Sequence, residues 1–216
     1  HRDLHSFPTR RSSDLAGSEG SGKLDPGLYF SYQAWHSTAG KDLYNQKNIE
    51  KAKKLIAEAG YKGEEIILVT NTSYDYMYKS AIVVEQQLKN LGFNVKMVVS
   101  DWAGSLAVRK DLGKWDLFFS SHSTRFDPVQ NSFYFVKDTS FFGYNNQEIE
   151  KWINVVASES DFEKRYKAYD QVQRIFYEDA AMIRLYDLGI WQVWNRKVKG
   201  YTPWVMINFN SAYIEK

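Results

Sequence analysis

The sequence predicts an α/β fold in which a mostly parallel sheet is flanked by helices. Between residues 49 and 120, stretches with helical apolar spacing alternate with short apolar runs typical of buried strands. Helices of roughly 10–16 residues between such strands favour right-handed crossovers and parallel pairing. We therefore expect the order α-β-α-β-α-β over this part of the chain.

The first half of this pattern starts at Asn48, which can cap a helix that ends before Gly60. Residues 65–70 (EIILVT) form a short apolar run, which indicates a buried strand. A second helix is expected from about residue 76 to 91, with Gly92 as its stop.

In the second half, residues 93–99 alternate between apolar and polar, as in a strand. Asp101 can cap a short helix through Leu112, and residues 115–120 form a third strand. Ligands of parallel sheets bind beyond the carboxyl ends of the strands. Three segments are expected there: residues 71–73, 100–102 and 121–131.

The remaining elements are two helices and a tail. Apolar spacing predicts helices over residues 147–157 and 162–177, the second capped by Asp161. Two strand-like runs follow within residues 181–194. The Gly/Ser-rich residues 16–23 (AGSEGSGK) indicate a loop.

The first fifteen residues, HRDLHSFPTRRSSDL, resemble the in-frame translation of a sequencing-library adapter. They show neither helical nor strand periodicity. We therefore expect a non-native tail and leave it out of the fold prediction.

Composition and charge argue against several classes of partner and chemistry. Twenty-eight basic and 26 acidic residues give a net charge of +2, too little to favour nucleic acid as a partner. The absence of cysteine excludes disulfides and thiol chemistry. With the tail set aside, the histidines left are His36 and His122, which are poor grounds for a metal site. We expect neither a metal nor another cofactor.

No nucleotide-binding, zinc-protease or nucleophile-elbow motif occurs in the sequence. His122 lies among serines, and Asp101 and Asp127 form a candidate carboxylate pair, so an extracytoplasmic α/β hydrolase is the alternative function. Simpler interpretations exist for both carboxylates, because Asp101 can cap a helix and Asp127 precedes Pro128 in a turn. The sequence therefore favours binding without chemistry.

Five segments carry a more specific signal. NIEKAKKLIAEAGY at residues 48–61 is similar to a D/N-P-x-K-A-K-x-L-L-x-E-A-G-Y pattern, and residues 115–131 (WDLFFSSHSTRFDPVQN) are similar to D-x-x-x-x-x-W-x-x-x-x-D-P-x-x-N. The others are residues 86–103, 165–186 and 198–201. In this order they resemble family 5 of the extracytoplasmic solute-binding proteins, the dipeptide-, oligopeptide-, glutathione- and nickel-type receptors of ABC importers. Ala181 and Arg184 stand where the family pattern has proline.

The resemblance implies one lobe of a two-lobed, type II periplasmic-binding-protein fold, with the second lobe largely missing. The expected division is an adapter-derived tail (1–15), a loop and hinge approach (16–30), a C-terminal ligand-binding lobe (31–183) and a segment returning towards the missing N-terminal lobe (184–216). The hinge is expected near residues 25–27 and 182–186.

The resemblance also implies the ligand-binding residues. Peptide receptors of the family carry an Asp at the position of Thr124, so simple dipeptide recognition is in doubt. Arg125 either pairs with a ligand carboxylate or forms a structural pair with Asp127 or another acid of the loop. The other candidate ligand-binding residues, each with a packing or loop role as its alternative, are His122, Asp127, Trp102, Asn71 and Ser73.

The resemblance further implies a monomeric receptor outside the cytoplasmic membrane, in the periplasm or lipid-anchored at the outer face. Its expected partners are a small peptide-like solute and an ABC permease in the membrane.

Overall fold

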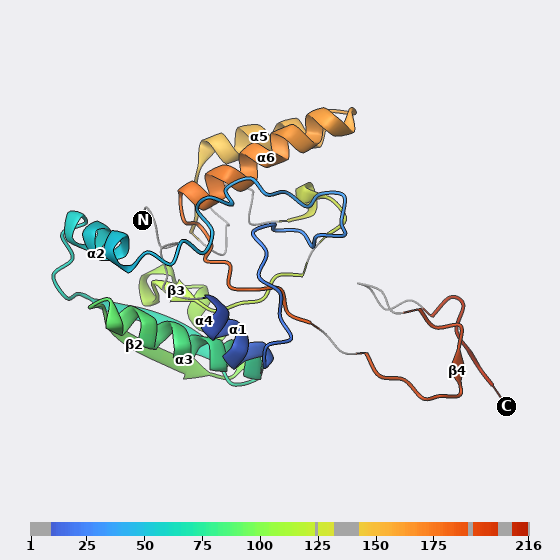
Figure 1. Ribbon diagram of the computed structural model, residues 1–216, viewed down its shortest axis with the longest axis horizontal. Helices are drawn as coiled ribbons and strands as arrows, with labels where there is room; N and C mark the ends of the chain where they lie inside the picture. Colours follow the sequence, from blue (N-terminus) through green and yellow to red (C-terminus); the bar gives the residue numbers. More distant parts are fainter. Residues whose placement is uncertain (1–9, 124, 132–142, 190–191, 203–208, 216) are drawn as a thin grey trace.

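The computed structural model describes residues 10–123, 125–131, 143–189, 192–202 and 209–215 (Figure 1). Its centre is a three-stranded parallel sheet in the order β2-β1-β3. The strands are β1 (Glu65–Asn71), β2 (Asn94–Ser100) and β3 (Leu117–Phe118). The predicted parallel α/β arrangement is confirmed.

Strand β3 is shorter than the six residues predicted, for a reason visible in its contacts. The Asp116 amide donates to the Ile67 carbonyl at 3.0 Å, and the Asp116 carboxylate accepts from the Ile67 amide at 2.7 Å. A side chain thus replaces a backbone acceptor where β3 would begin. Beyond the strand, the Phe119 amide still donates to the Val69 carbonyl at 2.9 Å, so β3 stays aligned with β1.

The helices of this layer begin where the sequence places their caps. Helix α2 (Ile49–Glu58) is capped by Asn48, whose side chain accepts from the Lys51 amide, and α3 (Asp75–Asn90) follows β1. Helix α4 (Trp102–Arg109) is capped by Asp101. It ends earlier than predicted, because Asp111 caps a separate turn, η2 (Leu112–Lys114).

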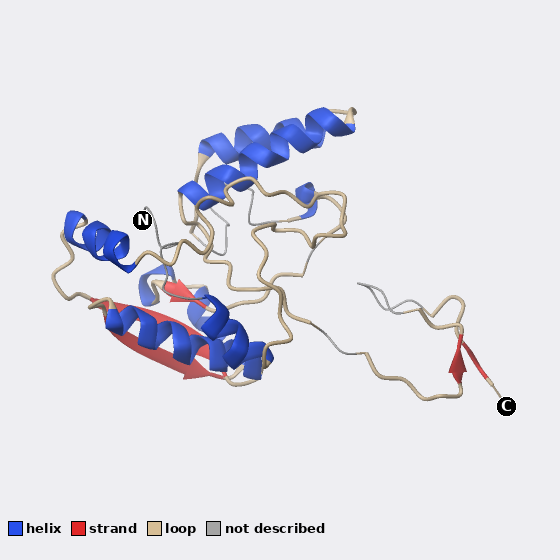
Figure 2. Ribbon diagram, viewed as in Figure 1, coloured by secondary structure: helices blue, strands red, loops and turns tan. Residues whose placement is uncertain are grey.

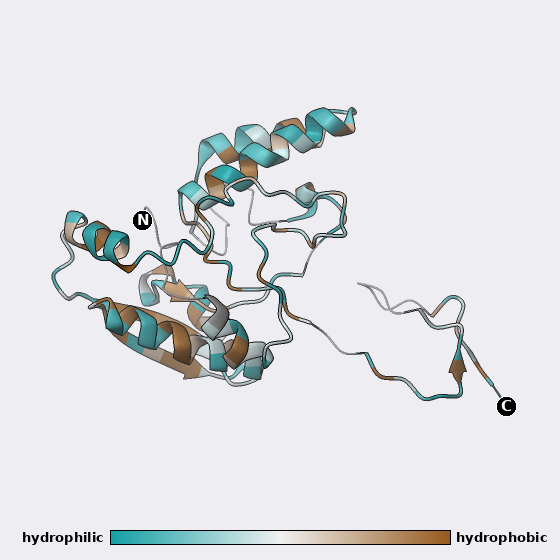
Figure 3. Cartoon of the chain, in the orientation of Figure 1, coloured by the Kyte–Doolittle hydropathy of each residue, from teal (hydrophilic) through white to brown (hydrophobic). Residues whose placement is uncertain are grey.

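The core of this layer lies between α3 and the sheet (Figure 2). Figure 3 shows apolar residues concentrated on the strands and along this helix. The buried members are Leu68, Ala81, Val84, Leu88 and Val95.

A second core surrounds the helical hairpin of α5 (Gln147–Ser158) and α6 (Phe162–Glu178), which match their predicted bounds to within one residue. Three buried residues from the segment before α2 complete this core: Leu28, Tyr29 and Trp35. The turn η3 (Pro128–Gln130) packs next to α5.

At the N-terminal end, α1 (Arg10–Ser18) packs against α3, and the Ser80 hydroxyl donates to the Ser13 carbonyl at 3.1 Å. The predicted loop at residues 16–23 is therefore wrong in its first part, since the helix continues to Ser18. The adapter origin of residues 1–15 stays a prediction.

The strand-like runs predicted in residues 181–194 are wrong for the described part of that range, where only an isolated bridge at Asp187 occurs. Ile183 and Leu185, whose apolar character suggested a strand, pack against the sheet core without forming one. Farther on, β4 (Val198–Lys199) and β5 (Tyr213–Ile214) pair antiparallel in an arm that stands apart from both cores (Figure 1). Within the described ranges, no helix is long and apolar enough to cross a membrane.

Candidate ligand-binding site

The candidate site lies at the carboxyl edge of the sheet, where the loops after β1 and β2 meet. The Thr72 amide donates to the Ser100 carbonyl at 2.9 Å. The Ser73 hydroxyl oxygen accepts from the Trp102 amide, also at 2.9 Å. These two bonds hold the loops side by side, as expected for the end of a parallel sheet.

Asn71 ends β1 with its side chain completely buried. Its Oδ1 accepts from the Tyr74 amide at 3.1 Å, and its Nδ2 points at the Met77 sulfur at 3.2 Å. Both ends of the amide therefore hold the turn that leads into α3. Nothing in these contacts supports a role for Asn71 as a donor at the pocket edge.

Trp102 forms an aromatic pair at the same edge. It is half-buried, and its ring meets Tyr74 edge to face, with centroids 5.5 Å apart and an interplanar angle of 83°. Tyr74 is 40% exposed. Tyr74 could not be identified from the sequence, because its position before α3 gives no sign of the contact with Trp102. Aromatic surface of this kind suits the apolar part of a ligand.

Residues 121–131 form the candidate ligand loop, and its second half, the turn η3 and Asn131, is held firmly to other elements. The Asp127 carboxylate caps η3 by accepting from the Val129 amide at 3.1 Å, and it pairs with Arg165 of α6 at 2.5 Å. The Asn131 amide donates to the hydroxyl of the buried Tyr29 at 3.0 Å.

Arg165 extends this anchorage into the helical hairpin. It also donates to the Val156 carbonyl at 2.8 Å, and its guanidinium lies 5.1 Å from the centroid of the Trp35 ring. The Asp–Pro and Asn positions of the loop thus serve as scaffold, which leaves the described residues 121–123, 125 and 126 as the part available to a ligand.

Arg125 is exposed in that available part. Its positive charge works to lower the pKa of two nearby groups, the hydroxyl of the buried Tyr29 and the imidazole of His122. Asp127, which the sequence offered as a structural partner of Arg125, is paired with Arg165 instead. Across the described ranges, Arg125 makes no ion pair within 4.0 Å, so its guanidinium can meet an anionic group from outside. Thr124 lies outside the described residues.

His122 lies deeper in the loop than Arg125. Burial lowers the pKa of its imidazole to about 4, and the positive charges of Arg184 and Arg125 contribute to the same shift. The side chain is therefore neutral at pH 7. A neutral imidazole can contribute a hydrogen bond or a flat contact surface without adding charge.

The hydrolase alternative finds little support in these contacts. Asp101 accepts from the Gly104 amide at 2.7 Å as the cap of α4, and Asp127 is paired with Arg165. A hydrolytic pair needs a nucleophile and a base in mutual contact, and neither carboxylate has His122 as a partner. Among the described residues, no cluster of three or more His, Cys, Asp or Glu side chains could hold a metal ion.

Comparison with known proteins identifies the family of the chain and its relatives. The profile described as "Bacterial extracellular solute-binding proteins, family 5 Middle" matches residues 16–143. The probable peptide ABC transporter periplasmic-binding protein y4tO of Sinorhizobium fredii is 35% identical over 79 residues, which cover 34% of this chain and 15% of that protein. The oligopeptide-binding protein AppA of Bacillus subtilis is 28% identical over 163 residues, covering 66% of this chain and 29% of that protein.

Among solved structures, that of the oligopeptide-binding protein AppA from Bacillus subtilis in complex with a nonapeptide superimposes with a TM-score of 0.76 at 19% identity. The superposition covers 98% of this chain and 47% of that one. It supports the periplasmic-binding-protein fold, and it shows that the chain spans about half the length of such a receptor. Because the family profile matches more than half of its residues, the chain belongs to the bacterial extracellular solute-binding proteins of family 5.

Proposed function

We propose that the chain is the ligand-binding lobe of the substrate-binding component of an ABC importer, and that its solute is a peptide-like molecule bearing a carboxylate. The observation that carries this proposal is the exposed Arg125 in the loop that follows β3, which makes no ion pair with another side chain among the described residues. A planar guanidinium is suited to bidentate contact with a carboxylate.

The surroundings of Arg125 favour the same kind of ligand. Thr124 supplies no negative charge where peptide receptors of the family have Asp, and the acidic Asp127 is neutralised by Arg165. His122 is neutral. The loop therefore presents net positive charge, while Trp102 and Tyr74 offer apolar surface at the carboxyl edge of the sheet.

The mechanism is binding without a chemical step. The solute binds between this lobe and a second lobe, and its differential affinity favours the closed form. The closed receptor, a monomer outside the cytoplasmic membrane, then delivers the solute to the permease. Peptide-related names among the relatives support the substrate class.

The test uses the full-length receptor, obtained by recovering the complete gene. A mixture of free-acid peptides of two to nine residues is screened by native mass spectrometry, and the tightest binder is also made as its C-terminal amide. Calorimetry then compares both forms on the wild type, on Arg125→Ala and on the matched control Arg174→Ala, which removes an exposed arginine of α6.

Loss of a charge-assisted contact corresponds to about tenfold to hundredfold weaker binding. We expect that loss for the amide on the wild type and for the acid on Arg125→Ala, with acid and amide then bound equally by that variant. Arg174→Ala should behave as the wild type. Equal affinity of the wild type for acid and amide would refute the role of Arg125, and the absence of any bound peptide would refute the substrate class.

A further inference from the structure

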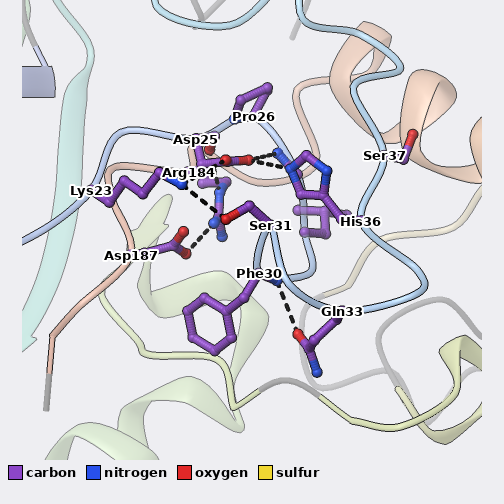
Figure 4. Close-up of polar contacts among 12 residues, drawn as sticks. Lys23, Asp25, Pro26, Phe30, Ser31, Gln33, His36, Ser37, Arg184 and Asp187 are labelled. Carbon is purple, nitrogen blue, oxygen red and sulfur yellow. Dashed lines mark hydrogen bonds and ion pairs between the residues drawn. The ribbon is translucent and has the colours of Figure 1, made fainter.

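Two segments far apart in sequence cross at the edge of the lobe, around Lys23 and Asp187 (Figure 4). The Lys23 amide donates to the Asp187 carbonyl at 3.0 Å, and the Asp187 amide donates to the Lys23 carbonyl at 2.7 Å. Because this bridge is isolated, two backbone hydrogen bonds alone would hold the crossing weakly. Side chains must supply the rest of its stability.

Arg184 supplies contacts to both segments. Its Nε donates to the Asp25 carbonyl at 2.7 Å, and its guanidinium forms an ion pair with the Asp187 carboxylate. The Arg184 and Asp187 side chains are each only 12% exposed, so the pair is largely shielded from water. The proline of the family pattern could make neither contact, because it has no donor group.

Asp25 is itself fixed in position. Its carboxylate accepts from the Gly27 amide at 2.7 Å and is hydrogen-bonded to the His36 Nε2 at 2.8 Å. Burial alone would raise the pKa of Asp25, but these two bonds together with the electrostatic interactions with His36 and Arg184 more than offset it, and the pKa lies below its ordinary value. The Asp25 carboxylate is therefore charged at neutral pH.

The segment around Asp25 is tied in turn to α6. The Tyr177 hydroxyl donates to the Pro26 carbonyl at 2.6 Å, and Gln173 accepts from the Leu28 amide at 3.1 Å. Contacts from Arg184 to Asp25 therefore reach a rigid part of the lobe.

We propose that Arg184 is a positioning residue that fastens the incoming and outgoing connections of the lobe into one rigid crossing. As far as it concerns lobe closure, the inference rests on the proposed function: closure would then bend the chain outside the Lys23–Asp187 crossing, not within it. The arm with β4 and β5 follows this crossing in the sequence (Figure 1).

A guanidinium is suited to this role because its fork meets two acceptors at once, whereas a lysine ammonium acts as a point charge. Burial raises the pKa of the Asp187 carboxyl, Arg184 and Lys23 oppose the rise, and Asp25 adds to it. Removing Arg184 should therefore raise that pKa further, and Arg184→Lys should restore it while regaining only part of the geometric constraint.

The test is amide hydrogen exchange at Lys23 and Asp187 in this chain, followed by NMR, with the pKa of Asp187 measured from its carboxyl resonance. Arg184→Met should speed exchange at both amides tenfold to hundredfold and raise the Asp187 pKa. Arg184→Lys should keep that pKa near the wild-type value with an intermediate loss of protection. The control Arg174→Met, on α6, should change neither.

Unchanged exchange at both amides in a folded Arg184→Met variant would overturn the proposal. Should that variant not fold, Arg184→Lys serves as the test. Wild-type protection of both amides in Arg184→Lys would equally refute the proposal, because lysine cannot reproduce the two-acceptor geometry of the guanidinium. In the full-length receptor, exchange at the two amides should be the same with and without the selected peptide acid, and a difference would place the bend inside the crossing. If no peptide binds, the proposed function fails, while exchange in the present chain still decides the role of Arg184.

Discussion

Replacing His122 with glutamine should remove a fall in stability that the wild type suffers on mild acidification. In the folded chain the pKa of His122 is about 4, lowered by burial and by two nearby arginines, against 6.5 for an ordinary histidine. Between these values the unfolded chain binds a proton that the folded chain does not. Protonation therefore favours unfolding, and the free energy of unfolding falls as the pH drops through this window.

The size of the effect follows from the two pKa values. Their difference of about 2.5, at 1.36 kcal/mol for each pKa unit, gives about 3 kcal/mol once the pH is below 4. At pH 5 the same linkage gives about 2 kcal/mol relative to pH 7.5. At pH 5 ordinary carboxylates are still mostly ionised.

The assay is urea unfolding of wild type and His122→Gln at pH 7.5 and at pH 5, followed by tryptophan fluorescence. Glutamine keeps a polar side chain but cannot take up the proton. The wild type should lose about 2 kcal/mol more than the variant between the two pH values, whatever their difference at pH 7.5. Parallel losses in both proteins would show that His122 is not buried as a neutral side chain, and would refute this account of the loop.

Two further predictions concern packing and the scaffold of the site. Asp127→Asn should lower the free energy of unfolding by about 1–3 kcal/mol, because it leaves Arg165 half-buried without its carboxylate, whereas Asp111→Asn, in an exposed pair, should leave the free energy of unfolding nearly unchanged; urea unfolding at pH 7.5 measures both. Gly40→Ala should be more destabilising than Gly60→Ala, since both have positive φ but a Cβ at position 40 would lie 2.7 Å from a tyrosine ring of α6, while the space at position 60 is open. Equal changes in melting temperature for the two alanine variants would contradict the packing described there.

The fold could be predicted wherever local chemistry decides it. Asn48, Asp101 and Asp161 were expected as helix caps, and each accepts a backbone hydrogen bond in the first turn of its helix. A cap acts within three residues, so its signal is complete in the sequence. The alternation of helices and short apolar runs likewise requires only neighbouring residues.

Elements whose cause lies elsewhere in the chain could not be predicted. Residues 183 and 185 have the apolar character of a strand but pack on the sheet core without pairing. Conversely, β4 and β5 have two residues each and are separated by 13 others, so no local period marks them. Helix α1 lacks a clear apolar face in the sequence and lies against α3 through contacts that only the structure shows.

The same distinction between local causes and causes elsewhere in the chain applies to the candidate site. From the sequence, a candidate ligand loop is predicted at the carboxyl edge of the sheet, because ligands of parallel sheets bind there. The sequence could not identify the partner of Asp127, since Arg165 lies 38 residues away on α6. That single contact removes Asp127 as a partner of Arg125, and the pairing of Arg125 with a ligand carboxylate stays a prediction.

Under the proposed function, the same distribution of charge predicts an orientation for a bound peptide. A peptide has an ammonium at one end and a carboxylate at the other, and a loop with an acidic side chain at position 124 would attract the ammonium. Here that position is Thr124, Asp127 is neutralised, and the charges that act on His122 are those of Arg125 and Arg184. Coulomb attraction in such a setting favours the carboxylate end at the loop and disfavours the ammonium. The comparison of peptide acid with peptide amide therefore measures the direction in which the solute lies as well as the role of Arg125.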